Sequence, residues 1–341
     1  MEGLVTKALT RLAVPAVLAL TLGAALPAQA AGTSNWVPRA ALPTPLEGHC
    51  TAVIGDKILT AYGFSPIGGD SNGLRVFDIA KNAWSLGPAA PLPAHSEGYR
   101  GVSHGGKLFC IGGRGPGGAL NTLERFDPAT ATWTTLASMP DARAGTTAAV
   151  LGDGIFVFGG RKGAAPCAGP AVAPGATTTV LRYDIAKNTW SNAGNLAVDR
   201  SDATVARVGD RIFVFGGCSG ATTFASAEVF NPHTMTSTLL PVTMTGGPRS
   251  DASAATDGDL IHVVGGFDGA GGPAPALNHL IFNPHTNAFT VGTPMPTHCS
   301  GTVNRAELEM VSHGDRLFAV GGSCPAFGAS QDNVDMLKLN P

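Results

Sequence analysis

The chain contains six short hydrophobic runs, and each run ends abruptly in a glycine pair or its remnant. A short apolar run that stops at glycine is typical of a fully buried β-strand followed by a turn. The runs recur about every fifty residues, a period typical of an array of repeated units. They occupy residues 58–63, 108–113, 155–160, 211–217, 260–266 and 317–322. In the first run, Tyr62 stands where the others carry the first glycine.

Other signals keep fixed distances from each glycine pair. A further glycine lies seven residues before the pair, and in most units aspartate follows it, as a tight hairpin requires. These glycines are Gly55, Gly105, Gly152, Gly209, Gly258 and Gly314. After the pair come a strand that ends in Asp or Asn and, six residues later, a strand opened by Trp, or by Ser237 or Phe289 in its place. Each unit therefore predicts four antiparallel strands.

Four antiparallel strands repeated six times predict an all-β, six-bladed β-propeller over residues 34–341. One unit is too small to bury its own core, so we expect a single domain. The last unit stops at its turn and lacks a fourth strand, whereas the chain near Trp36 has a fourth strand with no third before it. We therefore expect the N-terminal strand to close the last blade, which would also remove open sheet edges.

Residues 1–30 have the features of a signal peptide. Lys7 and Arg11 make the start positive, residues 12–26 form an apolar core too short for an ordinary membrane span, and Ala28 and Ala30 form a small-residue cleavage site. We expect cleavage after Ala30 and a secreted or periplasmic mature protein. An uncleaved anchor is the alternative.

The overall charge adds little. The formal net charge is −2 and charged residues make up 13 % of the chain, so we expect neither a nucleic-acid nor a membrane-surface partner. A closed ring needs no second copy to complete its core, so we expect a monomer.

Three features together resemble the kelch repeat: the hydrophobic run with its glycine pair, the aromatic residue followed by Asp at the end of the third strand, and the Trp that follows. The resemblance covers nearly all of residues 34–341 and departs from the pattern at Tyr62, Ser237 and Phe289. It implies a scaffold that carries binding modules in some proteins and enzymes in others, so it leaves the function open.

Export makes disulfides plausible among the six cysteines. Cys167 and Cys218 follow the third and fourth glycine pairs, and equivalent loops of neighbouring units share a face, so we expect them to pair. Cys299 and Cys324 lie in two loops of the last unit. The kelch resemblance implies that these loops emerge on one face, so we expect a second disulfide there.

The remaining cysteines give no clear pairing. Cys110 lies inside a hydrophobic run and is expected to be an inert core thiol. Cys50 is left over, either as a small buried side chain or as a nucleophile. His49-Cys50 and His298-Cys299 lack metal-ligand spacing, because adjacent residues of a strand point to opposite faces. We expect no metal site.

An arginine lies sixteen residues before the glycine pair in four consecutive units, and in three of them an acid follows two residues later. These residues are Arg143, Arg200, Arg249 and Arg305, with Asp202, Asp251 and Glu307. The two-residue spacing places each arginine and its acid on one side of a strand, so we expect a charged ring at one mouth of the channel. Arg100 and Glu309 occupy the next position on that side.

The role of this predicted charged ring has two interpretations. An arginine could pair with the acid of the neighbouring unit and staple the blades together. Alternatively, the arginines could grip a carboxylate or sugar ligand. The kelch resemblance implies the second role, since kelch proteins that bind acidic peptides use arginines at this position.

Our leading hypothesis is therefore an exported binding module for an acidic peptide or a carbohydrate at an arginine-rich mouth. The alternative is a sugar epimerase or mutarotase without a cofactor, because the chain resembles the exported sialic-acid epimerases of kelch form. Glu307 or Asp251 beside an arginine would then be the acid–base group. With three tyrosines, the chain does not favour a copper enzyme of the galactose oxidase type. We expect no cofactor.

Overall fold

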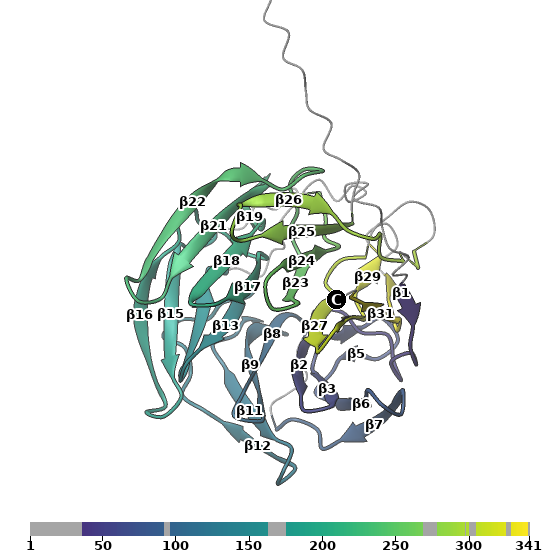
Figure 1. The fold of residues 1–341 in the computed structure, drawn as a ribbon. Coiled ribbons are helices and arrows are strands. Elements are labelled where there is room, and N and C mark those ends of the chain that lie inside the picture. The colour runs from purple at the N-terminus through teal and green to yellow at the C-terminus, as the bar shows by residue number, and fades with distance from the viewer. Residues whose placement is uncertain are drawn as a thin grey trace, which may run out of the picture. The chain divides into compact units, whose positions relative to one another are not determined.

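The computed structural model describes residues 36–91, 96–162, 175–268, 278–296, 298–299, 305–324 and 329–339. In these residues the secondary structure consists of strands and turns without a helix. Thr33–Pro341 forms one compact unit, in which sheets are arranged around a common centre (Figure 1). The predicted all-β, propeller-like arrangement is confirmed, whereas the predicted signal peptide, residues 1–30, lies outside the described residues.

The first three repeats each place four strands in sequential order. Repeat 1 contains β2 (Cys50–Ile54), β3 (Lys57–Ala61), β6 (Leu74–Asp78) and β7 (Ala83–Gly87). Repeat 2 contains β8 (Ser96–His104), β9 (Lys107–Gly115), β11 (Leu123–Asp127) and β12 (Thr132–Thr135), with the short β10 (Gly118–Ala119) paired to β9. Repeat 3 contains β13 (Thr147–Leu151), β14 (Gly154–Phe158), β15 (Thr179–Asp184) and β16 (Thr189–Asn195).

The last three repeats follow the same order. Repeat 4 contains β17 (Thr204–Val208), β18 (Arg211–Phe215), β21 (Ser226–Asn231) and β22 (Thr236–Thr243). Repeat 5 contains β23 (Ser253–Thr256), β24 (Ile261–Val264), β25 (His279–Asn283) and β26 (Ala288–Val291). Repeat 6 contains β27 (Glu309–His313), β28 (Arg316–Val320) and β31 (Val334–Lys338).

Short hairpins follow three of the glycine pairs or their remnants. They are β4 (Phe64–Ser65) with β5 (Gly69–Asp70), β19 (Cys218–Ser219) with β20 (Thr222–Thr223), and β29 (Ser323–Cys324) with β30 (Ala329–Ser330).

The predicted closure is confirmed. The N-terminal strand β1 (Trp36–Pro38) pairs antiparallel with β31, with Trp36 opposite Leu337, and supplies the fourth strand of the last sheet. Trp36 is buried and packs into a cluster with Met295 and Leu317. The closing strand is therefore part of the core as well as of the sheet.

The strand pairing gives five large sheets in the described part of the chain, whereas the sequence predicted six separate blades. The difference arises because repeats 3 and 4 merge into one eight-stranded sheet through a parallel bridge between Asn195 of β16 and Thr236 of β22. Gly194 permits this approach, since a Cβ there would collide with the Met235 carbonyl oxygen. The pairing alone therefore does not confirm a blade count of six.

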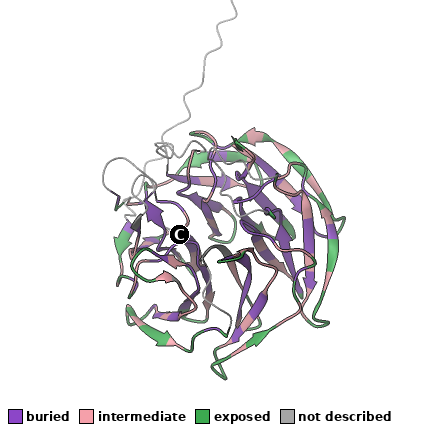
Figure 2. Ribbon diagram, turned by 180° about the vertical axis from the view of Figure 1, so that it is seen from behind, coloured by how far each residue is buried: buried purple, intermediate pink, exposed green. Residues whose placement is uncertain are grey.

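The strands at the outer edge are more exposed than those inside the ring, as Figure 2 shows. Every residue of β14 is buried, whereas most residues of β7, at the outer edge of repeat 1, are exposed. This gradient is expected where sheets pack face to face around a centre.

The glycine pairs form the joints between successive repeats. In repeats 3 to 6 the backbone N–H of the second glycine donates to a carbonyl oxygen of the following repeat. The bonds run from Gly160 to Arg200 (3.0 Å), Gly217 to Arg249 (2.9 Å), Gly266 to Arg305 (3.2 Å) and Gly322 to Leu46 (2.8 Å). The first glycine of each pair has positive φ, and a Cβ there would collide with the same carbonyl oxygen. Only glycine meets both requirements without strain.

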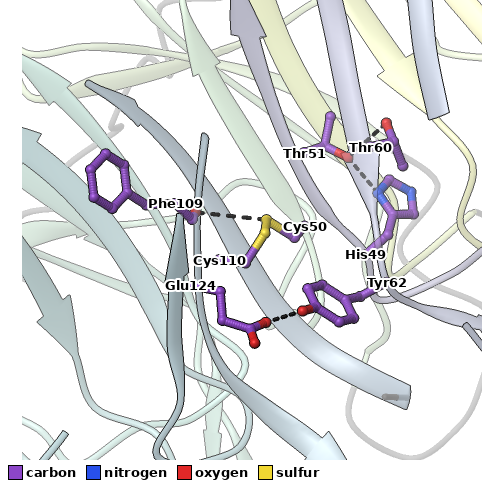
Figure 3. The surroundings of a disulfide bond; sticks show 8 residues. All are labelled: His49, Cys50, Thr51, Thr60, Tyr62, Phe109, Cys110 and Glu124. Atoms are coloured by element: carbon purple, nitrogen blue, oxygen red, sulfur yellow. Dashed lines mark hydrogen bonds between the residues drawn. A yellow bond between two sulfur atoms is a disulfide. The ribbon is translucent and has the colours of Figure 1, made fainter. Parts of the chain in front are cut away.

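Two cysteine expectations are corrected. Cys50 of β2 and Cys110 of β9 form a disulfide, with their Cα atoms 5.6 Å apart, so Cys110 is not a free core thiol and Cys50 is not left over (Figure 3). The sequence reasoning compared loops, whereas this bond joins buried strands of adjacent repeats. The bond leaves the Cys50 sulfur without a hydrogen, so its 3.7 Å approach to the Phe109 carbonyl oxygen is a packing contact.

The other cysteines agree with expectation as far as they are described. Cys299 and Cys324 form the predicted disulfide, with a Cα separation of 5.6 Å. Cys218 is disulfide-bonded, and its predicted partner, Cys167, lies outside the described residues.

We predict that Trp36→Ala destabilises the whole unit, because Trp36 both fills the core and belongs to the closing strand. The loss should be about 3 kcal/mol or more, as for other large aromatic residues removed from a core. Thermal unfolding followed by circular dichroism measures it. Val37→Ala is the matched control, since Val37 is on the same strand but exposed. Equal melting temperatures for the two variants would contradict the role of Trp36.

Candidate functional site

The four predicted arginines lie inside the fold. Their exposed fractions are between 0 and 2 %, so their guanidinium groups do not form an open mouth. Three of them donate to the carbonyl oxygen of the first glycine in their own repeat. The pairs are Arg143 with Gly159 (3.1 Å), Arg200 with Gly216 (2.5 Å) and Arg249 with Gly265 (3.3 Å). Arg305 donates to the carbonyl oxygens of Asn333 and Ala319.

Three of these arginines also pair with an acid of the same repeat. Arg200 lies 2.8 Å from Glu228 of β21, and Arg305 lies 3.1 Å from Asp335 of β31. Arg143 lies 3.0 Å from Asp141. The stapling interpretation expected pairs between neighbouring repeats, and these pairs within repeats correct it. Glu228 and Asp335 both lie on the third strand of their repeats, and the sequence alone already shows an acid at this strand position in both repeats.

The acids of the predicted ring do come together. Asp202, Asp251 and Glu307 all have left-handed backbones, with φ of 54°, 55° and 53°, and Gly145 and Gly48 occupy the equivalent positions in repeats 3 and 1. Backbone hydrogen bonds join these five residues in one arc. Each N–H donates to the carbonyl oxygen of the preceding member, from Asp202 to Gly145 (2.7 Å), Asp251 to Asp202 (2.8 Å), Glu307 to Asp251 (3.0 Å) and Gly48 to Glu307 (3.0 Å).

We call these five residues the axial arc. A left-handed backbone is uncommon in residues other than glycine and costs roughly 1 kcal/mol or more in each, and such residues concentrate at functional sites. Three acids share it in one arc, at positions where repeats 1 and 3 have glycine. Because Asp202, Asp251 and Glu307 each come two residues before the innermost strand of their repeat, the arc lies at one end of the inner strands.

Side chains near the arc fix its acids. Arg161, which follows the glycine pair of repeat 3, pairs with Asp202 of repeat 4, and the Ser201 hydroxyl lies 2.9 Å from the same carboxylate. The Ser323 hydroxyl donates to Glu307 at 3.1 Å. Sequence reasoning missed Arg161, although its place directly after a glycine pair puts it beside the next repeat.

The pKa of Asp251 is strongly raised. Burial, and then the Asp202 carboxylate, raise the pKa of Asp251 to about 8, against smaller opposing effects of Arg161 and Arg100. A carboxyl group with this pKa is mainly protonated at neutral pH, so it can donate a hydrogen bond and exchange a proton there.

A cavity of about 470 Å³ lies beyond the arc, lined by residues of the inner strands β2, β8, β13, β17, β23 and β27. Arg100 of β8 and Glu309 of β27 line it and form an ion pair between repeats 2 and 6. Arg100, expected to contact ligand, is thus engaged with Glu309. Most other lining side chains are Ala, Val, Thr or Ser.

Metal binding has no geometric support in the described residues. No three His, Cys, Asp or Glu side chains within them are placed to hold one ion. His49 lies 2.6 Å from the Thr51 hydroxyl and 3.2 Å from the Val320 carbonyl oxygen, and its burial lowers its pKa to about 3 (Figure 3).

The described residues also contain no helix long and apolar enough to cross a membrane.

Comparison with known proteins identifies the family. The family model "KLHDC2/KLHL20/DRC7 Kelch-repeats domain" matches residues 29–160 and 102–322. The chain belongs to the kelch-repeat family.

Curated relatives include kelch-like proteins. Kelch-like protein 36 of Rattus norvegicus is 28 % identical over 187 residues, which is 54 % of this chain and 29 % of that protein. Kelch-like protein 38 of Homo sapiens is 26 % identical over 189 residues, which is 54 % of this chain and 31 % of that protein. The matched part thus spans about a third of the length of these relatives.

Repeat 1 departs from the kelch pattern, and the neighbouring repeat departs with it. Tyr62 replaces the first glycine, keeps its positive φ of 60° and is fully buried. Its hydroxyl donates to Glu124 of β11 (Figure 3). Glu124 occupies the third-strand position of Glu228 and Asp335, but repeat 2 has Ser96 where those repeats have the partner arginine.

Glu124 is consequently a buried acid without an arginine. Burial raises its pKa to about 7, and one of its carboxyl oxygens has no hydrogen-bond partner in the described residues. Folding therefore favours the protonated form of this carboxyl group.

We predict that Glu124 contributes stability to the kelch unit at pH 5 and that this contribution is lost by pH 8. The folded pKa of about 7 exceeds the ordinary 4.5, so this stabilisation is full below pH 4.5 and is lost as the pH rises through 7. Glu124→Gln keeps a neutral side chain at every pH, so it should flatten this part of the profile. Denaturant unfolding at a series of pH values measures the effect. Asp153→Asn, at an exposed hairpin, is the control. A Glu124→Gln profile parallel to wild type would contradict the prediction.

Proposed function

We propose that this kelch chain is a binding module that meets a protein or peptide partner at the axial arc. Kelch-repeat proteins generally bind protein partners, which supports the class of function. The observation that carries the proposal is the arc, where Asp202, Asp251 and Glu307 share a left-handed backbone around one end of the inner strands. These backbone conformations are unfavourable for residues other than glycine, and contact with a ligand is one reason why a protein retains them.

The charge at the arc bears on the ligand class. The four buried arginines that precede the first strands give little support to an acidic peptide, because N–H groups of these side chains already serve internal carbonyl oxygens and carboxylates. The arc instead offers carboxyl groups, which accept hydrogen bonds from N–H and O–H donors. Peptide backbones and lysine side chains offer such donors, as do the hydroxyls of a carbohydrate.

A sugar epimerase or mutarotase remains a second candidate because of Asp251. Its raised pKa of about 8 suits proton exchange near neutral pH. Glu307, the other candidate, accepts a hydrogen bond from Ser323. We therefore assign the acid–base role to Asp251 if the chain is an enzyme.

We also infer that the ring has six blades. Six inner strands line one cavity, and each of the six repeats contributes one of them, which supports this count. Closure by β1 within the same chain supports a monomer.

We further propose that the protein is exported after cleavage behind Ala30. Two described disulfides support an oxidising compartment, because such bonds are rare in a reducing cytosol. The sparse charge supports a partner other than nucleic acid or a membrane surface.

The binding proposal predicts that ligands selected on the intact protein depend on the arc. A displayed random-peptide library is panned on wild type, and the affinity of each enriched peptide is measured by calorimetry. Asp251→Asn and Glu307→Gln should each weaken binding about tenfold, the effect of losing roughly 1.4 kcal/mol. Asp153→Asn is the control, since Asp153 lies at an exposed hairpin between β13 and β14, away from the arc. Peptides that bind all variants equally would place the site elsewhere.

The same Asp251→Asn variant separates the two candidates. Wild type is incubated with sialic acid and with neutral reducing hexoses, and anomer or epimer exchange is followed by NMR. An enzyme would accelerate exchange and lose most of this turnover in the variant while still binding sugar. A binding module would show no acceleration with any of these sugars.

The export proposal predicts the mature terminus. Expression of the full sequence with its leader, followed by intact mass analysis and N-terminal sequencing, should give a chain that begins at Ala31. A retained leader would contradict it.

A further inference from the structure

A buried line of hydrogen bonds connects the surface of repeat 5 to the closing strand of the ring. His262 of β24 and His279 of β25 face each other, with His262 Nδ1 2.9 Å from His279 Nε2. His262 Nε2 lies 3.1 Å from Asp257 Oδ2, and His279 Nδ1 lies 2.7 Å from the Thr293 carbonyl oxygen. The Trp36 indole N–H donates to the same Thr293 oxygen at 3.0 Å.

These contacts determine the number of protons in the line. The Thr293 oxygen only accepts, so His279 Nδ1 must carry a proton. His279 carries no second proton when neutral, so its Nε2 must accept from a proton on His262 Nδ1. His262 Nε2 then faces the Asp257 carboxylate, and this contact also needs a proton. Two neutral imidazoles supply two protons for three hydrogen bonds, so the line requires one more.

The surroundings place the additional proton on His262. The hydrogen bonds that Asp257 accepts from His262 and from the Leu260 amide outweigh the effect of its burial and lower the pKa of Asp257, so it is a carboxylate. Burial, and then the nearby His262, lower the pKa of His279 to about 4, so it is neutral. His262 is thus the imidazolium, with 2 % of its surface exposed.

Among the described residues, the charged group that contacts either ring is Asp257, which pairs with His262. The β23–β24 turn contributes Asp257 and the exposed Asp259, and the neighbouring strands β23 and β26 carry no charged residue. The elements packed on this side from repeat 6 present Met310, Leu317, Ala319 and Leu337. His262 therefore has the Asp257 carboxylate as its counter-ion.

Loss of the additional proton would disturb the whole line. His262 Nε2 and Asp257 Oδ2 would then face each other as two acceptors. If the remaining proton of His262 moved to Nε2, the conflict would pass to His279 Nε2. To remove that conflict, the proton of His279 would have to move from Nδ1 to Nε2. His279 would then lose its hydrogen bond to Thr293, the residue whose carbonyl oxygen also accepts from Trp36.

We propose that this line is a proton-dependent latch on the closure of the ring, with the His262 imidazolium holding β1 in place through His279, Thr293 and Trp36. The latch is closed while His262 carries the additional proton that the line requires, and it loosens when that proton is lost. It couples the solvent pH to the one strand that joins the two ends of the chain.

The test uses the full chain labelled with ¹⁵N in histidine and tryptophan. At pH 6 the His262 ring should show two protonated nitrogens, and His279 should be neutral with its proton on Nδ1. Hydrogen exchange of the Trp36 indole N–H, assigned with Trp36→Phe, should rise more steeply between pH 6 and pH 8 than in free tryptophan.

A matched pair of variants isolates the additional proton. In Asp257→Asn the amide N–H can donate to a neutral His262, so three hydrogen bonds form without the extra proton, and Trp36 exchange should follow the pH dependence of free tryptophan. Asp210→Asn alters an exposed Asp–His pair, Asp210 with His233, and should behave as wild type. A neutral His262 at pH 6, or an Asp257→Asn profile identical to wild type, would overturn the latch.

Discussion

The contact between a glycine pair and the carbonyl oxygen of the next repeat is the constraint on which the rest of this structure depends. The second glycine donates its N–H to that oxygen, and the first must lack a Cβ because the oxygen lies too close. In repeats 3 to 6, the following repeat is thus positioned by a backbone contact that a side chain would abolish. Since the contact recurs at successive joints, it sets the angle between repeats and, with it, the place of the arc and the cavity.

The arginines belong to the same joint. The backbone oxygen of Arg200 is the acceptor for Gly160 of the preceding repeat, while its guanidinium group binds Gly216 and Glu228 of its own repeat. Arg200 therefore connects two repeats through its backbone oxygen and stabilises the sheet of its own repeat through its side chain. Burying this charge is tolerable because an acid and carbonyl oxygens satisfy it.

The sequence predicts the features that repeat with a fixed period. The glycine pairs, the hairpin glycines and the strand at Trp36 follow from local rules of turns and strand pairing, so the repeat pattern and the closure by β1 could be predicted. The charged residues recur equally well, but their partners lie in other strands. Arg200 and Glu228 are 28 positions apart, and the spacing of two that links Arg200 to Asp202 does not predict the left-handed backbone of Asp202. The buried Cys50–Cys110 bond was missed for the same reason.

The joint between repeats 1 and 2 shows what happens when this constraint is relaxed. Tyr62 occupies the position that normally demands glycine, and Ser96 replaces the arginine, so two elements of the joint are altered together. The Cys50–Cys110 bond connects β2 and β9 at this place, and the Tyr62 hydroxyl meets the acid that the missing arginine would have neutralised. A covalent bond thus secures the joint, because a tyrosine with positive φ and an acid without an arginine both weaken it. The raised pKa of Glu124 follows from this exchange, because in the described residues no arginine pairs with this buried acid.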